Sequence, residues 1–232
     1  NIMRFGNNFM LNIYNYNSMK DSFLHKGLRK KLVDDLVKKG IKNDKVLNAI
    51  MQIPRHLFLD NAFVNFAYQD KAFPIGSDQT ISQPYTVAFQ TELLDVKPYE
   101  RILEVGTGSG YQAAVLTLLH AEVFTIERQK KLFLKTKKFL PDLGYNCMFF
   151  YGDGYKGIPN FAPFDKIIIT CGAPYIPKDL LDQLKVGGKM VAPIGEGDVQ
   201  VMHLIEKISD QENNISTHGN FSFVPMLGDK QE

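Results

Sequence analysis

Two amino-terminal segments carry apolar residues at the three- and four-residue spacing of amphipathic helices. One covers residues 24–40 and ends at its glycine, and the other covers residues 43–53 and ends before Pro54. A proline cannot continue a helix, and either Asn43 or Asp44 can cap the second helix at its start. The pattern therefore predicts a helical cap ahead of the rest of the chain.

A segment rich in proline, glycine and hydroxyl residues comes next, at positions 73–85. Apolar residues return to helical spacing from Val87 to Leu94, so we predict a loop followed by a helix that Ser82 caps. Thr80 and Ser82 have two interpretations. They are capping residues alone, or their hydroxyls face a ligand beside the next strand.

Short apolar runs then alternate with helical segments. Strands are predicted at residues 102–105, 123–127, 146–151, 166–170 and 189–194, helices after the first strand and at 176–184, a turn at 187–188, and a closing hairpin at 200–208 and 215–224. This order predicts an α/β fold with a doubly wound, mostly parallel seven-stranded sheet. The helical cap precedes the sheet and the β-hairpin ends it.

Length and composition favour one globular domain with appendages. The 232 residues are 44% hydrophobic and 22% charged, with a formal net charge of +2. This balance predicts no nucleic-acid-binding surface, and no run of about 18 apolar residues predicts a membrane span. Cys147 and Cys171 offer neither a disulfide framework nor metal-ligand spacing, so we expect reduced thiols in a cytoplasmic protein with no metal site.

The amino-terminal residues differ in character from the remainder of the chain. Residues 1–18 are rich in Asn, Tyr and Met, and Met19 looks like a natural start. They lack the basic start and apolar run of a signal peptide. We expect residues 1–18 to be an upstream or artificially added leader that is poorly ordered. Residues 19–232 are then predicted to form one domain.

The densest chemical signal comes directly after the first predicted strand. Glu104 lies inside that strand, and Gly106, Gly108 and Gly110 come next at alternate positions. Glycine is needed where the backbone turns sharply and a ligand lies against bare main chain. Glycines also close ordinary strand-to-helix loops, so the motif alone is weak evidence. Glu127 ends the second strand about 20 residues later, where a carboxylate can accept hydrogen bonds from both hydroxyls of a ribose.

A second acid occupies the equivalent place on the third predicted strand. Asp153 lies between Gly152 and Gly154 at the carboxyl end of that strand. In a sheet of this kind such a residue faces the ligand crevice. Asp153 as a simple turn residue is the alternative.

Two sets of motifs resemble known families. The E-x-G-x-G-x-G spacing is similar to the cofactor loop of the class I S-adenosylmethionine-dependent methyltransferases. Residues 74–76 (Pro-Ile-Gly) and 79–84 (Gln-Thr-Ile-Ser-Gln-Pro) resemble the signature of the protein-L-isoaspartate (D-aspartate) O-methyltransferases. Further similar stretches lie at 67–70, 103–112, 125–128, 152–154, 164–170, 183–188 and 223–227, so the resemblance spans about residues 24–228. Asp78 departs from the glycine usual in the family, and residues 171–174 replace an alanine-rich stretch.

The resemblance implies a Rossmann-like methyltransferase fold and a function. A methyl group would pass from S-adenosyl-L-methionine to the free α-carboxylate of L-isoaspartyl residues in damaged proteins and peptides, leaving S-adenosyl-L-homocysteine. Residues 19–95 would form the helical cap and active-site loop, and residues 96–232 the cofactor-binding sheet and a substrate strand. The expected partners are isoaspartyl peptides and proteins, without nucleic acid or membrane, and the expected state is a monomer.

The same resemblance implies roles for individual residues. Ser82 is the expected catalytic hydroxyl. The expected cofactor-binding residues are Thr80, Glu104, Gly106, Thr107, Gly108, Gly110, Glu127, Asp153 and Gly154, and the expected substrate-binding residues are Ile75, Thr80, Ser82 and Val224. No general base is required, because a carboxylate with a pKa of about 4 is already ionised at neutral pH. We interpret His56 as structural, because nothing near it in the sequence supplies a partner at a reacting centre.

Two other functions stay open on the sequence. One is methyl transfer to a small molecule, which the Thr-Ile-Ser-Gln-Pro loop disfavours. The other is a non-catalytic module that binds S-adenosylmethionine, which the departure at Asp78 allows. Methyl transfer from labelled S-adenosylmethionine to an isoaspartyl peptide, but not to the matching aspartyl peptide, would distinguish the isoaspartyl methyltransferase from both alternatives.

Overall fold

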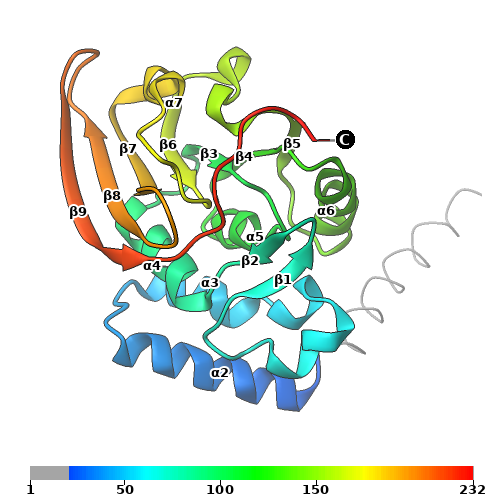
Figure 1. Ribbon diagram of the computed structural model, residues 1–232. Coiled ribbons are helices and arrows are strands. Elements are labelled where there is room, and N and C mark those ends of the chain that lie inside the picture. The colour runs from blue at the N-terminus through cyan, green and yellow to red at the C-terminus, as the bar shows by residue number, and fades with distance from the viewer. Residues whose placement is uncertain (1–20, 232) are drawn as a thin grey trace, which may run out of the picture.

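The computed structural model describes residues 21–231 (Figure 1). The leader predicted at residues 1–18 therefore lies outside the described residues. The division of residues 19–232 into a cap with its loop and a sheet stays a prediction, although the elements fall in that order along the chain.

Within residues 21–231 the main sheet has seven strands, in the order β5-β4-β3-β6-β7-β8-β9 (Figure 1). Their bounds are β3 (Arg101–Val105), β4 (Glu122–Glu127), β5 (Met148–Tyr151), β6 (Phe164–Ile169), β7 (Leu184–Ile194), β8 (Gln200–Lys207) and β9 (Asn213–Phe221). The first five run parallel, while β8 and β9 form the predicted antiparallel hairpin. The predicted fold class is confirmed, and β9 lies at the edge of the sheet.

Helices cover both faces of this sheet, as the doubly wound prediction requires. Alternate positions along β3 face opposite ways, since Ile102 packs in one buried cluster and Leu103 in the other. The first cluster includes side chains of α4 (Pro84–Leu94), α5 (Tyr111–Leu118) and α6 (Lys130–Asp142), and the second includes Leu180 of α7 (Lys178–Gln183). The central strands β3, β4 and β6 are thus buried on both faces.

The amino-terminal cap consists of α2 (Phe23–Lys38) and α3 (Asp44–Gln52), and α3 packs beside α4 and α5 (Figure 1). Asn43 rather than Asp44 caps α3, because its side chain accepts hydrogen bonds from the backbone of Lys45 and Val46. No helix among the described residues has the length and apolar character needed to cross a bilayer.

Residues 73–85 differ from the predicted loop. β1 (Phe73–Gly76) and β2 (Gln79–Ile81) form a small antiparallel hairpin, with Ser77 and Asp78 at its turn. Asp78 has a φ of 55°, in the left-handed region that glycine adopts most easily. The glycine usual in the family would adopt this conformation without strain, and Asp78 adopts it here.

Ser82 does not cap the following helix, so that part of the prediction is wrong. α4 begins at Pro84, and the backbone amide of Tyr85 donates to Asp70 Oδ1 at 2.8 Å. Asp70 also accepts a hydrogen bond from the Gln83 side chain. A carboxylate distant in sequence thus satisfies the start of the helix, and the Ser82 hydroxyl is not needed there.

Two boundaries in the second half of the chain also differ from prediction. The expected turn at Gly187 and Gly188 lies inside β7, where the register with β6 shifts between Phe164 and Lys166. Gly187 has a φ of 82°, so the strand continues through an irregularity instead of reversing. β9 ends at Phe221, before the predicted end at Val224.

Candidate active site

A cavity lies at the carboxyl ends of β3, β4 and β6, beside the β1–β2 hairpin. Eight of the predicted site residues line it, namely Thr80, Ser82, Gly106, Thr107, Gly108, Glu127, Gly154 and Val224. Glu104, Gly110, Asp153 and Ile75 do not. The ends of parallel strands meet here, which is where α/β sheets bind ligands.

The turn after β3 forms the floor of this cavity from bare backbone. Gly106 has a φ of 98°, and a Cβ added to it would lie 2.5 Å from Thr170 Oγ1. The Thr170 hydroxyl donates to the Gly106 carbonyl at 2.7 Å and fixes the turn from below. Any larger residue at 106 would displace this contact.

Gly110 serves packing rather than the cavity. It precedes α5 with a φ of 83°, and a Cβ there would lie 2.6 Å from Leu140 and 2.7 Å from Thr136 of α6. The Thr136 hydroxyl also donates to the Gly108 carbonyl. The close approach of α6 therefore requires glycine at 110 and holds the turn in place.

Glu127 brings a carboxylate to the wall of the cavity. Its Oε2 accepts a hydrogen bond from the Gly108 amide at 2.9 Å, and its Oε1 accepts one from the Gln129 amide at 2.8 Å. Burial raises the pKa of this carboxyl, and the backbone amides act against that rise. The side chain is held at the end of β4 with its oxygens next to the glycine turn.

Glu104 lies beneath the turn and is fully buried. Its Oε2 accepts a hydrogen bond from the Thr125 hydroxyl at 2.6 Å, and that hydroxyl lies 2.6 Å from the hydroxyl of Thr107. Glu104 Oε1 has no hydrogen-bond partner among residues 21–231. Burial raises the pKa of this carboxyl to about 8, so it carries a proton at neutral pH. The structure places Glu104 as a support of the turn, not at its surface.

This placement predicts how stability depends on pH. The pKa of Glu104 is about 8 in the folded protein against 4.5 ordinarily, so its contribution is complete below pH 4.5 and is lost as the pH rises through 8. Between pH 4.5 and 8 the wild type should lose on the order of 5 kcal/mol in the free energy of unfolding from this group, and Glu104→Gln should not show that loss. Urea unfolding at a series of pH values measures it. Glu196→Gln, at an exposed position, is the control, and parallel curves for wild type and Glu104→Gln would disprove the assignment.

Asp153 and Ile75 lie just outside the cavity. Asp153 Oδ1 accepts a hydrogen bond from the Tyr155 amide at 2.9 Å and caps a short 3₁₀ turn, the geometry of its alternative interpretation. Ile75 is buried, and its Cδ1 would lie 3.4 Å from a Cβ on Gly108. Both residues border a glycine that lines the cavity, so they support its wall.

A second cavity of about 720 Å³ adjoins the first. Thr80, Ser82, Thr170 and Val224 line both cavities. The outer wall of the second is aromatic, with Tyr85, Phe89, Phe221 and Phe223, and no carboxylate among residues 21–231 lines it. The Ser82 position is therefore where the two spaces meet.

Val224 reaches this boundary through a short extended segment. Its carbonyl accepts a hydrogen bond from the Gly172 amide at 2.8 Å, and the Met226 amide donates to the Gly172 carbonyl at 2.7 Å. Figure 1 shows the red carboxyl-terminal segment crossing from β9 toward β4 and β5. The segment therefore closes one side of the first cavity.

Sequence reasoning missed two residues that shape the site. Thr170 comes directly after β6 and lines both cavities, and its place at the end of a predicted parallel strand was a signal that could have found it. Arg55 is fully buried, and its Nη2 donates to the Ser82 carbonyl at 2.9 Å. A single basic residue in an apolar stretch does not indicate that its side chain is buried against the active-site segment.

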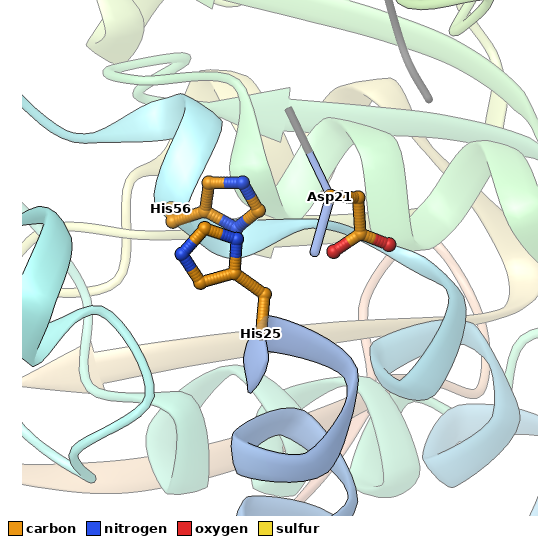
Figure 2. A group of neighbouring side chains, drawn as sticks. All are labelled: Asp21, His25 and His56. Carbon is orange, nitrogen blue, oxygen red and sulfur yellow. The ribbon is translucent and has the colours of Figure 1, made fainter. Parts of the chain in front are cut away.

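A polar cluster in the cap has the composition of a metal site. One ligand atom each from Asp21, His25 and His56 lie within 4.8 Å of one another (Figure 2). Arg29 already binds both oxygens of Asp21, and His56 Nδ1 lies 2.7 Å from the Tyr68 hydroxyl. The two imidazoles stack at 3.8 Å, which directs their in-plane lone pairs side by side. This cluster joins α2 to the segment after α3 and is a poor site for a cation, in keeping with the structural interpretation of His56.

The first cavity fits S-adenosylmethionine. The ligand offers ribose hydroxyls for Glu127 and no phosphate, and the glycine turn provides space where Cβ atoms would collide. The seven-stranded sheet with helices on both faces and this cavity define the chain as a class I S-adenosylmethionine-dependent methyltransferase.

Comparison with known proteins gives the family. The profile described as protein-L-isoaspartate(D-aspartate) O-methyltransferase matches residues 27–231, and the chain belongs to this family. A protein-L-isoaspartate O-methyltransferase of Christiangramia forsetii is 60% identical over 91% of this chain and 100% of its own length. One of Flavobacterium johnsoniae is 57% identical with the same coverage.

Two solved structures agree with this assignment. A protein-L-isoaspartate O-methyltransferase is 30% identical with a TM-score of 0.78, covering 86% of this chain and 66% of that one. A Plasmodium falciparum protein described as a putative enzyme of the same name, in complex with S-adenosyl-L-homocysteine, is 26% identical with a TM-score of 0.76, covering 86% and 98%. The predicted family, enzyme class and cofactor are confirmed.

Proposed function

We propose that this enzyme methylates the free α-carboxylate of L-isoaspartyl residues in damaged proteins and peptides, with Ser82 as its active-site hydroxyl. One observation carries the assignment of Ser82. Thr80, Ser82, Thr170 and Val224 form the boundary between the cofactor cavity and the adjoining aromatic cavity. A group on that boundary can contact a substrate held in one cavity and aligned with a methyl donor in the other.

The chemistry requires alignment rather than proton transfer. The bound cofactor supplies a methyl group made electrophilic by its sulfonium. An isoaspartyl carboxylate oxygen would take that methyl group and leave S-adenosyl-L-homocysteine, while the residues of this chain would hold the two reactants in line. The carboxylate is already ionised at neutral pH, so no side chain needs to act as a base. Ser82 is proposed to donate a hydrogen bond to the other carboxylate oxygen, and Thr80 to support it from the same hairpin.

The cofactor and substrate residues receive roles consistent with their positions. Glu127 would bind the ribose hydroxyls, and the backbone at 106–108 would lie along the methionyl and ribose portions. Asp153 and Gly154 would lie near the adenine, with Gly154 in contact. Glu104 and Gly110 would act on the cofactor through the turn that they support.

The substrate is proposed to bind mainly through its backbone, as an extended segment beside Val224 and the hairpin that contains Ile75. A second cavity lined by no carboxylate of residues 21–231 suits an anionic peptide. We further propose a monomer that acts in the cytoplasm on peptides and proteins, with no nucleic-acid or membrane partner. Both cysteines are free thiols, as a reducing compartment would keep them.

A pair of peptides tests the function. The protein is incubated with labelled S-adenosylmethionine and two peptides that differ only in Asp against isoAsp, and base-labile label is expected on the isoAsp peptide alone. Label on neither peptide despite cofactor binding would contradict the proposed function and leave a small-molecule methyltransferase or a non-catalytic module. Variants with exchanged flanking residues should change KM only modestly, and strong sequence dependence would contradict binding through the backbone. Light scattering of the same sample reports the oligomeric state.

A further inference from the structure

Arg55 lies at the centre of the contacts behind the active-site hairpin. It begins a 3₁₀ turn, Arg55–Phe58, and its side chain is completely buried. Its Nε donates to the Ala67 carbonyl at 3.0 Å, and its Nη2 donates to the carbonyls of Ser82 at 2.9 Å and Lys71 at 3.4 Å. One guanidinium thus joins the segment before β1 to the residue after β2.

The same side chain also reaches the cofactor side of the site. The Arg55 guanidinium carbon lies 4.7 Å from the centre of the Tyr111 ring. Tyr111 is the first residue of α5, directly after the glycine turn, and it lines the cofactor cavity. Arg55 therefore contacts both the segment that carries Ser82 and the helix that begins at the end of the cofactor turn.

Its charge is held without an ion pair. No carboxylate among residues 21–231 lies within ion-pair distance of Arg55, and burial lowers the pKa of its guanidinium to about 10. The group still carries its charge at neutral pH. Because desolvating an unpaired cation costs free energy, an apolar residue of similar volume would be the better choice for stability alone. An apolar residue would lack the N–H donors that Arg55 directs at the three backbone carbonyls.

We propose that Arg55 is a positioning residue for methyl transfer, which fixes the backbone of Ser82 relative to the glycine turn and thereby aims the Ser82 hydroxyl. This inference rests on the proposed function of Ser82. A hydroxyl that moves by about 1 Å loses alignment with the carboxylate, and such a shift can cost about 100-fold in rate. Arg55 is buried away from both cavities, so it acts through Ser82 and not on the substrate.

Two substitutions separate geometry from charge. Lysine keeps the charge but carries its three N–H donors on one freely rotating nitrogen, whereas the planar guanidinium reaches several carbonyls at fixed angles. Arg55→Lys and Arg55→Ala are therefore both expected to lower kcat with isoaspartyl peptide by about 100-fold. The Kd for S-adenosylhomocysteine, measured by calorimetry, should change by no more than a few-fold. Guanidinium ion added at millimolar concentration should restore part of the kcat of Arg55→Ala, because it can occupy the space left by the side chain.

Lys207→Met is the matched control. Lys207 is another buried cation, and it donates to the carbonyls of Leu181 and Leu184 away from either cavity. The Lys207→Met variant should be less stable than wild type but should keep the wild-type kcat per folded molecule. The S-adenosylhomocysteine titration gives the concentration of folded protein. A kcat of Arg55→Lys within a few-fold of wild type would overturn the inference. A rise in the Kd for S-adenosylhomocysteine as large as the fall in kcat would also overturn it.

The same assays keep this inference separate from the proposed function. If wild type fails to methylate the isoAsp peptide, the proposed function is wrong and the positioning role falls with it. If wild type methylates that peptide and the Arg55 variants keep their kcat, the positioning role alone is wrong. An Arg55→Ala protein too unstable to titrate leaves Arg55→Lys to decide on the same two readouts.

Discussion

Ser82→Ala should lower kcat with isoaspartyl peptide by about 100-fold, because one hydrogen bond that orients the reacting group is lost. The expected Kd for S-adenosylhomocysteine stays near the wild-type value, since the glycine turn and Glu127 are unchanged. Ser82 does not cap α4, so its removal should leave the helix intact. Initial rates with an isoAsp peptide and calorimetric titration measure the two quantities.

Ser77→Ala is the matched control for this prediction. Ser77 belongs to the same hairpin but lies at its turn and lines neither cavity. Ser77→Ala should keep the wild-type kcat. Its free energy of unfolding should fall slightly, because residue 77 has a positive φ of 51°. Undiminished turnover in Ser82→Ala would refute the role assigned to Ser82.

The core of the fold could be predicted because its signals are local. Strands buried on both faces appear as short, mostly apolar runs, and β3, β4 and β6 each end at or beside a small or acidic residue that marks the ligand edge. The glycine turn is equally local, since its backbone angles require glycine in the sequence itself. Gly106, Gly108 and Glu127 can accordingly be assigned to the cavity from the sequence alone.

The boundaries of the site depended on contacts distant in sequence. The start of α4 is satisfied by Asp70, which no local pattern connects to Tyr85. The burial of Glu104 under the turn results from its face of β3, and a single acid in a strand does not reveal which face it occupies. Val224 lines the same cavity as Ser82, and the carboxyl-terminal segment that carries it is held there by its pairing with Gly172.

The helix α6 shows a different kind of omission. Its buried residues Leu132, Thr136 and Leu140 repeat every four positions and form a narrow stripe in a segment rich in lysine. The spacing was visible in the sequence, but a threonine in the middle weakens the apolar pattern. Thr136 supports the glycine turn, because its hydroxyl donates a hydrogen bond to the Gly108 carbonyl. A polar residue in a buried stripe can thus mark where a helix supports a site.

Glu127→Gln should weaken cofactor binding more than any other single change of similar size. The carboxylate accepts from two backbone amides, and a carboxamide has one oxygen for them and a nitrogen that cannot accept. The ribose hydroxyls proposed to bind Glu127 would also lose a charged acceptor, which costs about 1.5 to 3 kcal/mol and raises the Kd for S-adenosylhomocysteine by about 10- to 150-fold. Calorimetric titration gives that value directly, and kcat at saturating S-adenosylmethionine should fall much less.

The opposite end of the same strand supplies the control. Glu122 begins β4, half of its side chain is exposed, and its carboxylate lies 3.5 Å from Arg101. Glu122→Gln makes the same chemical change far along the strand from the glycine turn, so it should leave the Kd unchanged. If Glu127→Gln bound S-adenosylhomocysteine as tightly as Glu122→Gln, the ribose would not depend on this carboxylate. The difference between the two variants therefore measures what the position at the carboxyl end of β4 contributes to cofactor binding.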